Sequence, residues 1–467
     1  MKHYDAVVIG AGVLGCFAAR SLCRWKLSTL LLEGAGDVCT GITRANTAII
    51  YPGYDNRPGS RKARMTVRAN AAFPRLCEEL EVPFQRCGSL MLSYGPMGDR
   101  VLRQKLEQGR ENGVPDLRLL SGQQAEELEP GLKPGVSTAL YAPGTGTVNP
   151  WQLGIAACES AVKNGCELRL NSPVTAIGRQ GRNYIVETVE ECFSCAVVIN
   201  CAGLAADRVQ ELLFLPRIRI FPDGADYLVL DKNAPAPRHI LLHETEEKGK
   251  GLTAVPTVEG SLLLGPNRRP LSQPYAVEQK EIEGLKAQAA KLLPGLDMKW
   301  MIRSFGAVRP NPQMVELRAG EYVSTGRDMG DFPIDRPEPG FFSLIGIKTP
   351  GLTCADELGQ YLAAQAAEYL NAAPNPDFDP QRAAIPRPAA LSFAERKALV
   401  AAAPDYGEVL CLCEDVSRGE VLEAIRRGAV DVEGVKRRTG AGLGRCQGGR
   451  CRLRIEELLE EQRHGKL

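Results

Sequence analysis

The chain has 467 residues, several times the length of an ordinary domain, so two or three domains are expected. Of its residues, 44% are hydrophobic, which is enough to form hydrophobic cores. Its formal net charge is +1, so it has no strong electrostatic field that would attract nucleic acid or an acidic membrane surface. No run of about twenty apolar residues occurs, so no membrane-spanning helix is expected. The N-terminus leads directly into a strand pattern, which predicts an unprocessed cytoplasmic start.

The first predicted elements are a strand over residues 4–9, a helix over residues 13–25 and a second strand over residues 29–32. This order of strand, turn, helix and strand predicts a βαβ unit. Further strands are predicted over residues 196–199 and 342–347.

The turn of the βαβ unit contains the pattern G-x-G-x-x-G at Gly10, Gly12 and Gly15. The first glycine allows a tight turn, the second lets a pyrophosphate approach the backbone, and the third lets the helix pack closely on the strand. Glu33 ends the second strand, where a carboxylate accepts hydrogen bonds from a ribose. A glycine turn without a ligand is the alternative, and NAD and FAD are both open at this point.

The rest of the first 370 residues alternates between two kinds of segment. Helices are predicted over residues 149–164, begun by Pro150, and over residues 355–370. Short strands separated by turns, such as those over residues 226–231 and 261–265, fill the intervening segments. This arrangement predicts a doubly wound nucleotide domain that is interrupted by a sheet-rich domain.

Four segments resemble the D-amino-acid-oxidase-like flavoproteins, a family that includes glycine oxidase and glycerol-3-phosphate dehydrogenase. Residues 40–46 (TGITRAN) resemble the flavin-contacting loop, and residues 148–150 (VNP) resemble the start of a family helix. Residues 197–203 (VVINCAG) resemble the strand that ends beside the adenine half, and residues 346–353 (GIKTPGLT) resemble the segment that meets the flavin ring. The resemblance covers about residues 1–370 and implies FAD.

The resemblance implies an α/β, Rossmann-like FAD-binding domain made of residues 1–80, 141–205 and 321–371. An antiparallel-sheet α+β substrate domain, made of residues 81–140 and 206–320, is interleaved with it. The residues expected to contact FAD are Gly10, Gly12, Val13, Leu14, Gly15, Glu33, Thr43, Arg44, Asn46, Val174, Cys201, Ala202, Gly203, Gly346, Gly351, Leu352 and Thr353.

Lys348 is a candidate for a role beside the flavin on physical grounds as well. The loop with Gly346 and Gly351 leads into the helix over residues 355–370, whose N–H groups could bond the pyrimidine edge of a flavin. Reduced flavin is negatively charged there, so a helix N-terminus and Lys348 would stabilise it. The alternative is a solvated surface lysine.

The substrate site is predicted around Arg309, which matches an arginine that family members use on a carboxylate or phosphate. A guanidinium grips either anion through two hydrogen bonds, although a surface salt bridge is the alternative and Arg303 is a weaker candidate of the same kind. Tyr51 stands where relatives often carry histidine; with an ordinary pKa of about 10 it is a poor base but can orient a substrate. Asp223 stands where relatives often carry arginine. Both departures count against glycerol 3-phosphate, and His243 is either an alternative base or a polar surface group.

The segment after residue 371 is rich in Pro and Ala, which predicts a linker or a wrapping segment over residues 372–407. The chain has 15 cysteines, and this odd number argues against a secreted disulfide framework. Most are predicted to be buried thiols, and the C-x-x-C of Cys192 and Cys195 is interpreted as structural.

Residues 408–467 contain a C-x-C and a C-x-x-x-x-C motif, formed by Cys411, Cys413, Cys446 and Cys451. Four thiolates suit either zinc or a [2Fe–2S] cluster, but C-x-C departs from the usual zinc-ribbon spacing. Two short helices and a glycine-rich stretch are predicted between the motifs. The whole segment resembles the bacterioferritin-associated-ferredoxin domain, which implies a small α-helical [2Fe–2S] domain.

A flavin combined with an iron–sulfur cluster favours a dehydrogenase, because flavin takes two electrons from a C–H bond and can release them singly. This organisation resembles the flavoprotein subunit of anaerobic glycerol-3-phosphate dehydrogenases, and it also resembles 2-hydroxyglutarate and opine or imino-acid dehydrogenases with the same two modules. The resemblance implies oxidation of a small anionic hydroxy compound, either glycerol 3-phosphate or a 2-hydroxy acid. The implied electron acceptor is a second flavoprotein or a quinone-linked subunit, and any membrane association would arise through it. The alternatives are an amino- or imino-acid dehydrogenase and a redox subunit without substrate turnover.

Overall fold

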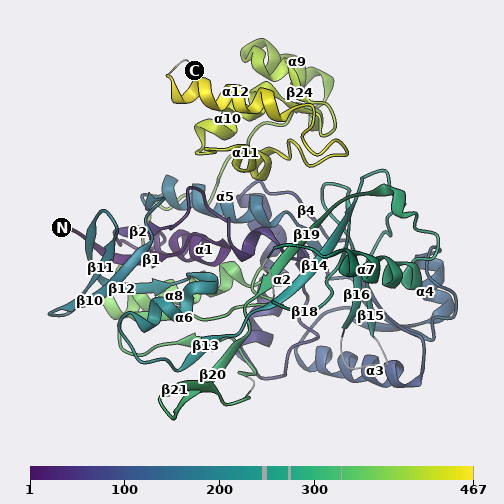
Figure 1. The fold of residues 1–467 in the computed structure, drawn as a ribbon, viewed down its shortest axis with the longest axis horizontal. Helices are drawn as coiled ribbons and strands as arrows, with labels where there is room; N and C mark the ends of the chain where they lie inside the picture. The colour runs from purple at the N-terminus through teal and green to yellow at the C-terminus, as the bar shows by residue number, and fades with distance from the viewer. Residues whose placement is uncertain (245–249, 272–274, 328, 466–467) are drawn as a thin grey trace. The chain divides into compact units, whose positions relative to one another are not determined.

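The structure is a computed structural model that describes residues 1–244, 250–271, 275–327 and 329–465. The chain divides into two compact units, Met1–Gln381 and Arg382–Leu467 (Figure 1). Across these described ranges, no helix combines the length and the apolar character needed to cross a bilayer.

An eight-stranded sheet forms the centre of the first unit. Its strand order is β10-β11-β12-β1-β2-β9, with β23 and β22 continuing from β12. The inner strand β1 (Lys2–Ile9) runs parallel to both β12 (Cys192–Asn200) and β2 (Thr29–Leu32). The other strands are β9 (Glu167–Arg169), β10 (Val174–Gln180), β11 (Asn183–Thr188), β22 (Ile334–Asp335) and β23 (Phe341–Leu344).

Helix α1 (Val13–Leu22) packs against both α5 (Pro150–Lys163) and α8 (Ala355–Leu370) (Figure 1). Small side chains such as Ala18 and Ala19 are completely buried between these helices and the sheet. Gly359 allows the closest approach, because a Cβ atom there would lie 2.5 Å from the carbonyl oxygen of Phe17. The predicted Rossmann-like domain is therefore confirmed.

A second, nine-stranded sheet has the order β18-β14-β17-β16-β15-β5-β7-β6, with β19 also paired to β14. Its strands come from two separate parts of the chain, as the interleaved domain requires. The sheet is antiparallel, as predicted, except at one place, where β15 pairs in parallel with β5 and Ile240 lies opposite Ser89. The strands are β5 (Ser89–Ser93), β6 (Arg118–Ser121), β7 (Thr138–Ala142), β14 (Asp223–Leu230), β15 (Ile240–Glu244), β16 (Lys250–Pro256), β17 (Leu262–Gly265), β18 (Arg269–Pro270) and β19 (Met301–Arg309).

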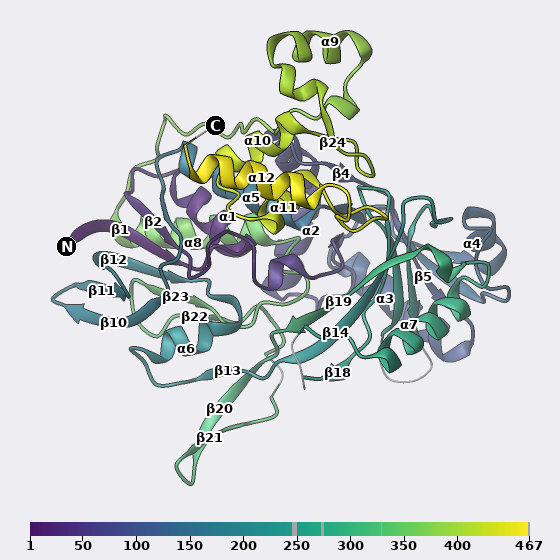
Figure 2. The same ribbon diagram turned by 45° about the horizontal axis from the view of Figure 1, so that its top comes forward.

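Helices and two small sheets complete the first unit. Helix α7 packs on β14 and β16, and α3 packs on β5 and β7. In Figure 2 the hairpin of β20 and β21 projects from the unit. The helices are α2 (Arg61–Glu79), α3 (Pro96–Glu111), α4 (Gly122–Leu128), α6 (Ala206–Glu211) and α7 (Gln279–Leu292). The small sheets contain β3 (Ile49–Ile50), β4 (Phe84–Gln85) and β8 (Gly146–Val148), and β13 (Ile218–Ile220), β20 (Pro312–Arg318) and β21 (Glu321–Ser324).

The second unit is mainly helical and has its own core, which includes Val421, Val435 and Ile455, each completely buried. Ser417 and Glu420 form a capping box at the start of α10. The elements are α9 (Phe393–Ala402), β24 (Val409–Cys411), β25 (Val416–Ser417), α10 (Arg418–Arg426), α11 (Val432–Thr439) and α12 (Arg452–Arg463).

The structure divides the predicted linker over residues 372–407 at Gln381. Residues 372–381, here called the strap, lie on the first unit, where Asn375 N donates to Arg24 O at 2.8 Å and Asp379 N donates to Asn164 Oδ1 at 2.7 Å. Residues 382–407 belong to the second unit and include α9, which has a capping box of its own. A single extended linker is therefore not formed, because both halves find hydrogen-bond partners.

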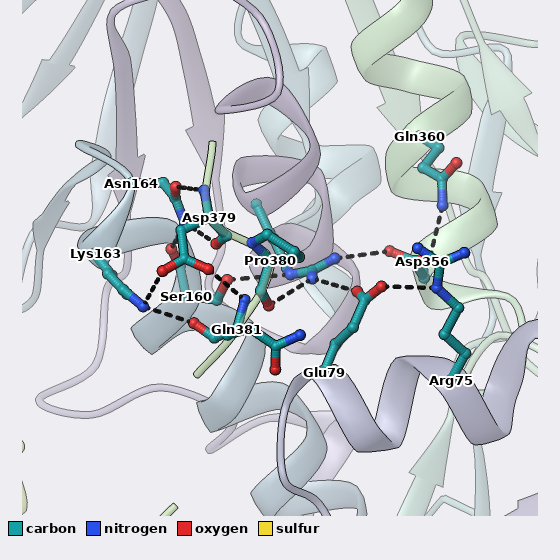
Figure 3. Close-up of polar contacts among 11 residues, drawn as sticks. Arg75, Glu79, Ser160, Lys163, Asn164, Asp356, Gln360, Asp379, Pro380 and Gln381 are labelled. Carbon is teal, nitrogen blue, oxygen red and sulfur yellow. Dashed lines mark hydrogen bonds and ion pairs between the residues drawn. The ribbon is translucent and has the colours of Figure 1, made fainter. Parts of the chain in front are cut away.

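The strap ends at a charged network around Arg20, a residue of α1 that is 0% exposed. Figure 3 labels the residues around it, including Glu79, Asp356 and Pro380. Its guanidinium donates to Ser160 Oγ at 3.1 Å, to Glu79 Oε2 at 3.0 Å and to the carbonyl oxygen of Pro380 at 3.2 Å. Asp356 Oδ1 lies 3.6 Å from Arg20 Nη1. Burial raises the pKa of Asp356, and the charge of Arg20 opposes that rise. Arg20 thus joins α1, α2, α5, α8 and the strap.

Candidate cofactor and substrate site

The turn between β1 and α1 has the geometry of a phosphate-binding loop. Gly10 has a φ of 97°, and a Cβ atom there would lie 2.6 Å from the carbonyl oxygen of Cys201. A Cβ atom at Gly15 would overlap the carbonyl oxygen of Gly10. Among the described residues, only Thr43 Oγ1 comes within 4 Å of a Cβ atom at Gly12, which leaves room there for a ligand. Helix α1 has no side-chain N-cap and no acid in its first turn, so its positive end suits a phosphate.

Glu33 is held beside this loop by two backbone N–H groups. Its Oε2 accepts from Ala11 N at 2.7 Å and its Oε1 from Ala35 N at 2.9 Å. Each carboxylate oxygen keeps a lone pair that can accept from a ribose hydroxyl. Val174 starts β10 nearby, since Ser172 N donates to Glu33 O at 2.8 Å.

The predicted flavin loop over residues 40–46 folds onto the start of α1. Thr43 Oγ1 accepts from Val13 N at 3.0 Å. The side chain of Asn46 shapes the loop itself, because its amide donates to Thr43 O and accepts from the N–H group two residues on. Arg44 is exposed, with its guanidinium 4.5 Å from the ring centroid of Tyr275. Contacts from Asn46 to FAD would therefore come from its backbone.

Cys201, Ala202 and Gly203 lie at the end of β12, on the other side of Gly10. Cys201 N donates to Ile9 O at 2.8 Å, and Gly203 has a φ of 60°. The structure thus brings these residues and the glycine loop to the same edge of the sheet.

The segment over residues 346–353 connects this edge to the second sheet. A Cβ atom at Gly346 would lie 2.8 Å from Pro312 Cβ, just past the end of β19. Gly351 N donates to Lys348 O at 2.6 Å, which makes a tight turn, and Thr353 Oγ1 accepts from Tyr51 N at 3.0 Å.

The end of α8 that follows Leu352 is less positive than the sequence analysis assumes. The first turn of α8 contains two acids, Asp356 and Glu357. Asp356 is paired with Arg20 and Glu357 with Arg68. The two arginines offset much of these charges, so the field of the helix N-terminus is weakened only in part, and Lys348 would add to any stabilisation of a reduced flavin.

Strands β14 and β19 bring the predicted substrate residues together. Asp223 lies opposite Arg309 and Tyr227 opposite Phe305, so these side chains share one face of the sheet. Tyr227 is 5% exposed and stacks on Phe305 with ring centroids 4.8 Å apart. Burial raises the pKa of Tyr227, the charge of Arg309 lowers it and Tyr51 raises it further. Tyr227 is a functional candidate that the sequence analysis missed; its only signal is its even spacing from Asp223 along the strand.

A pocket of about 460 Å³ opens beside this face. Its lining carries the cations Arg268, Arg327 and Lys348 and the anion Asp223. The full lining is Phe221, Pro222, Asp223, Arg268, Asn311, Pro312, Gln313, Gly326, Arg327 and Lys348. Arg268 and Arg327 were not predicted, because they lie outside every recognised motif.

Two weaker candidates lie away from this pocket. Arg303 is six residues before Arg309 on β19, a separation of about 20 Å along a strand. His243 lies on β15, which β17 and β16 separate from β14, and its ring packs edge-on against Tyr94. The structure therefore does not support His243 as the base.

In the second unit, the four predicted ligands form two neighbouring pairs, each with one cysteine from either end of the module. The thiol of Cys413 neighbours that of Cys446, and the thiol of Cys411 neighbours that of Cys451. Backbone N–H groups lower the pKa of Cys446, that of Arg450 most strongly, followed by those of Gly448 and Gly449. Burial raises the pKa of Cys451 to about 12. Within the described ranges, no group of three or more His, Cys, Asp or Glu residues is arranged to hold a single metal ion.

The glycine-rich stretch before Cys446 packs directly on the first pair of ligands. A Cβ atom at Gly444 would overlap the side chains of Cys413 and Glu414, so glycine is required there. Sulfur ligands surrounded by backbone N–H donors are typical of iron–sulfur sites. Cys192 and Cys195, by contrast, lie on β12 as an exposed and a buried free thiol.

Comparison with known proteins identifies both units. Residues 5–365 match the family model "FAD dependent oxidoreductase" (DAO), and residues 409–461 match "BFD-like [2Fe-2S] binding domain". The chain therefore belongs to the DAO family of FAD-dependent oxidoreductases and carries a C-terminal [2Fe–2S]-binding domain. FAD rather than NAD, and a cluster rather than zinc, are thereby established as its cofactors.

Similar proteins indicate more closely which kind of FAD-dependent oxidoreductase this chain resembles. A glycerol 3-phosphate dehydrogenase of Caloramator mitchellensis is 35% identical over 468 residues, covering 98% of this chain and 94% of the relative. The anaerobic glycerol-3-phosphate dehydrogenase subunit A1 of Haloferax volcanii is 25% identical over 503 residues, covering 98% and 83%. The fold matches L-alpha-glycerophosphate oxidase from Mycoplasma pneumoniae with FAD bound, with a TM-score of 0.73 at 23% identity over 82% of this chain and 99% of that one. The protein is an FAD-dependent dehydrogenase.

Replacement of Gly12 by valine is expected to weaken FAD binding about ten- to a hundred-fold, because the side chain would fill the space left for the pyrophosphate. The ratio of flavin to protein after purification measures this. Gly178→Val is the matched control, since Gly178 has nothing within 4 Å of its Cβ position and lies on β10, away from the turn. Normal flavin content in the Gly12 variant would contradict the assignment of the turn.

Proposed function

We propose that the protein oxidises glycerol 3-phosphate and passes the electrons from FAD through the [2Fe–2S] cluster to a separate electron-accepting subunit. The observation that carries the substrate assignment is the open pocket of about 460 Å³ with Arg268, Arg327 and Lys348 in its lining. With Asp223, the formal charge of these four side chains is +2, which suits a phosphate ester of about −1.5 to −2 better than a single carboxylate. Asp223 stands where relatives often carry an arginine, and Arg268 and Arg327 would supply the positive charge that is missing there.

In this proposal Arg309, Tyr51 and Lys348 act on the substrate. Arg309 is not in the pocket lining, but it lies opposite Asp223, which is, and its guanidinium would grip the anionic end of the substrate from that side. Tyr227 keeps its proton because burial raises its pKa, so it and Tyr51 would orient the hydroxyl group by hydrogen bonding. When bound, FAD supplies a two-electron acceptor for the C–H bond; the residues named here bind and orient the substrate beside it.

The proposal is tested by mixing the oxidised protein anaerobically with single substrates and recording flavin absorbance. Glycerol 3-phosphate is expected to bleach the flavin, whereas 2-hydroxyglutarate and proline are expected to act slowly or not at all. Bleaching by proline or another amino acid would instead favour an amino-acid dehydrogenase, in which Asp223 would accept from the ammonium group. An absence of bleaching by every compound would favour a redox subunit without turnover.

Replacement of Arg309 by alanine is expected to raise the KM for glycerol 3-phosphate about ten- to a hundred-fold, because a charged hydrogen-bond donor is lost. Flavin content should not change. Arg303→Ala, on the same strand but far from the pocket, serves as the control in steady-state assays with a dye acceptor. An unchanged KM in the Arg309 variant would refute its role in substrate binding.

The proposed acceptor is a second flavoprotein or a quinone-linked subunit in the cytoplasm or at the membrane. The support is the cluster-binding domain itself, together with the relative named as subunit A1 of an anaerobic enzyme. Substrate should reduce both cofactors in sequence, and an artificial dye should reoxidise them much faster than oxygen does. Rapid reoxidation by oxygen would argue for an oxidase.

A further inference from the structure

Three side chains in the pocket lining form a continuous chain of hydrogen bonds. Lys348 Nζ donates to Asn311 Oδ1 at 3.0 Å, and Asn311 Nδ2 donates to Asp223 Oδ2 at 2.6 Å. Asp223 is the first residue of β14, Asn311 lies between β19 and β20, and Lys348 lies in the loop after β23. Segments from three parts of the chain are therefore linked at the pocket.

The chemistry of the chain allows only one orientation of the middle amide. A carboxylate only accepts hydrogen bonds and an ammonium group only donates them. Asp223 therefore holds the NH₂ group of Asn311, which turns the amide oxygen toward Lys348. A carboxylate on one end of an amide also polarises it, which strengthens the bond at the other end.

We propose that Asp223 and Asn311 are positioning residues that hold the amino group of Lys348 where the anionic group of the substrate binds. The proposal rests on the pocket described under the proposed function and extends it to two residues that would not touch the reacting atoms. It also explains why a pocket that binds an anion contains the acidic side chain of Asp223.

If Asp223 acts by positioning Lys348, the substitution Asp223→Asn should change anion binding in the opposite direction from that expected from charge alone. Asp223→Asn removes a negative charge, and by charge alone the pocket should then bind an anion more tightly. If Asp223 positions Lys348, the same change frees the amide of Asn311 to turn its NH₂ group toward the ammonium group. Anion binding should then weaken.

The probe for this test is inorganic phosphate, titrated calorimetrically into the FAD-loaded, oxidised protein. The dissociation constant is expected to rise about three- to ten-fold in Asp223→Asn and similarly in Asn311→Ala. Asp297→Asn is the matched control, since it removes the same charge from an exposed helix cap outside the pocket. Unchanged or tighter phosphate binding in Asp223→Asn would overturn the proposal.

A second substitution isolates the positioning effect. In a Lys348→Met background there is no ammonium group to position, so Asp223→Asn should now tighten phosphate binding by its charge. If Asp223→Asn weakens phosphate binding equally with and without the Lys348→Met substitution, the proposal is also overturned, because the effect of Asp223 would then not depend on Lys348. These binding measurements need no turnover, so they can be interpreted even if the protein does not oxidise glycerol 3-phosphate. If the unaltered protein binds no phosphate, both the anion-binding role of the pocket and this inference are wrong.

Discussion

Replacement of Arg20 by methionine is expected to lower the free energy of unfolding of the first unit by about 3–5 kcal/mol. Methionine roughly fills the space but leaves the carboxylates of Glu79 and Asp356 without their shared buried cation. The carbonyl oxygen of Pro380 also loses a donor, so the end of the strap is weakened. Chemical denaturation followed by tryptophan fluorescence measures this loss specifically, because all three tryptophans lie in the first unit.

Arg75→Ala is the matched control for Arg20. Arg75 pairs with the same Glu79, with Nε 3.1 Å from Oε1, but its side chain is 83% exposed. An exposed pair of this kind contributes less than about 1 kcal/mol. Equal losses in the two variants would show that burial of Arg20 is not the source of its effect.

The loss in Arg20→Met should depend on pH. Burial raises the pKa of Asp356, so the folded state binds its proton more readily than the unfolded state does. Lowering the pH therefore favours the folded state at this site, and removal of Arg20 strengthens the effect. The difference between variant and unaltered protein should be smaller in mildly acidic than in neutral solution.

Replacement of Cys446 by serine is expected to abolish iron binding and the visible absorption of the [2Fe–2S] cluster while FAD stays bound. The backbone N–H groups that lower the pKa of Cys446 favour a thiolate, and a serine hydroxyl offers neither that charge nor a soft ligand. The predicted FAD contacts all lie before Gln381, and the second unit has its own core. Iron and flavin contents, measured on the same sample, test this.

Cys411→Ser should behave in the same way, and Cys192→Ser, which changes an exposed thiol of the first unit, should retain both cofactors. Loss of FAD together with iron would show that the two units do not fold independently. Full iron content in Cys446→Ser would remove that residue from the set of ligands.

Local signals predicted the elements around the FAD-binding edge closely. The strand Thr29–Leu32 and the helix Ala355–Leu370 have the predicted bounds, and the helix after Asn149 begins at Pro150. Each is marked by a continuous apolar run, an amphipathic repeat or a cap, and such signals are contained in neighbouring residues. The glycine motif is a local signal of the same kind, because the close packing at Gly10 and Gly15 leaves no room for a larger side chain.

Contacts between distant segments could not be predicted in the same way. The parallel pairing of β15 with β5 depends on how the second sheet closes, which no local pattern encodes. The pocket gathers Arg268, Asn311 and Arg327 from loops with no motif. The strap carries a composition typical of a linker, yet it finds partners on α1 and α5 only once those helices are packed together.

Anchored residues of the two cofactor-bearing units lie very close together in the sequence. Lys163 Nζ donates to Gln381 O at 2.9 Å in the first unit, and Arg427 Nη1 donates to Ala383 O at 2.8 Å in the second. Only Arg382 lies between these two anchors. So short a tether fixes the local concentration of one redox unit around the other, whatever the dilution of the protein. Electron exchange between them should therefore be first order, and only the onward step to a separate acceptor should slow as the solution is diluted.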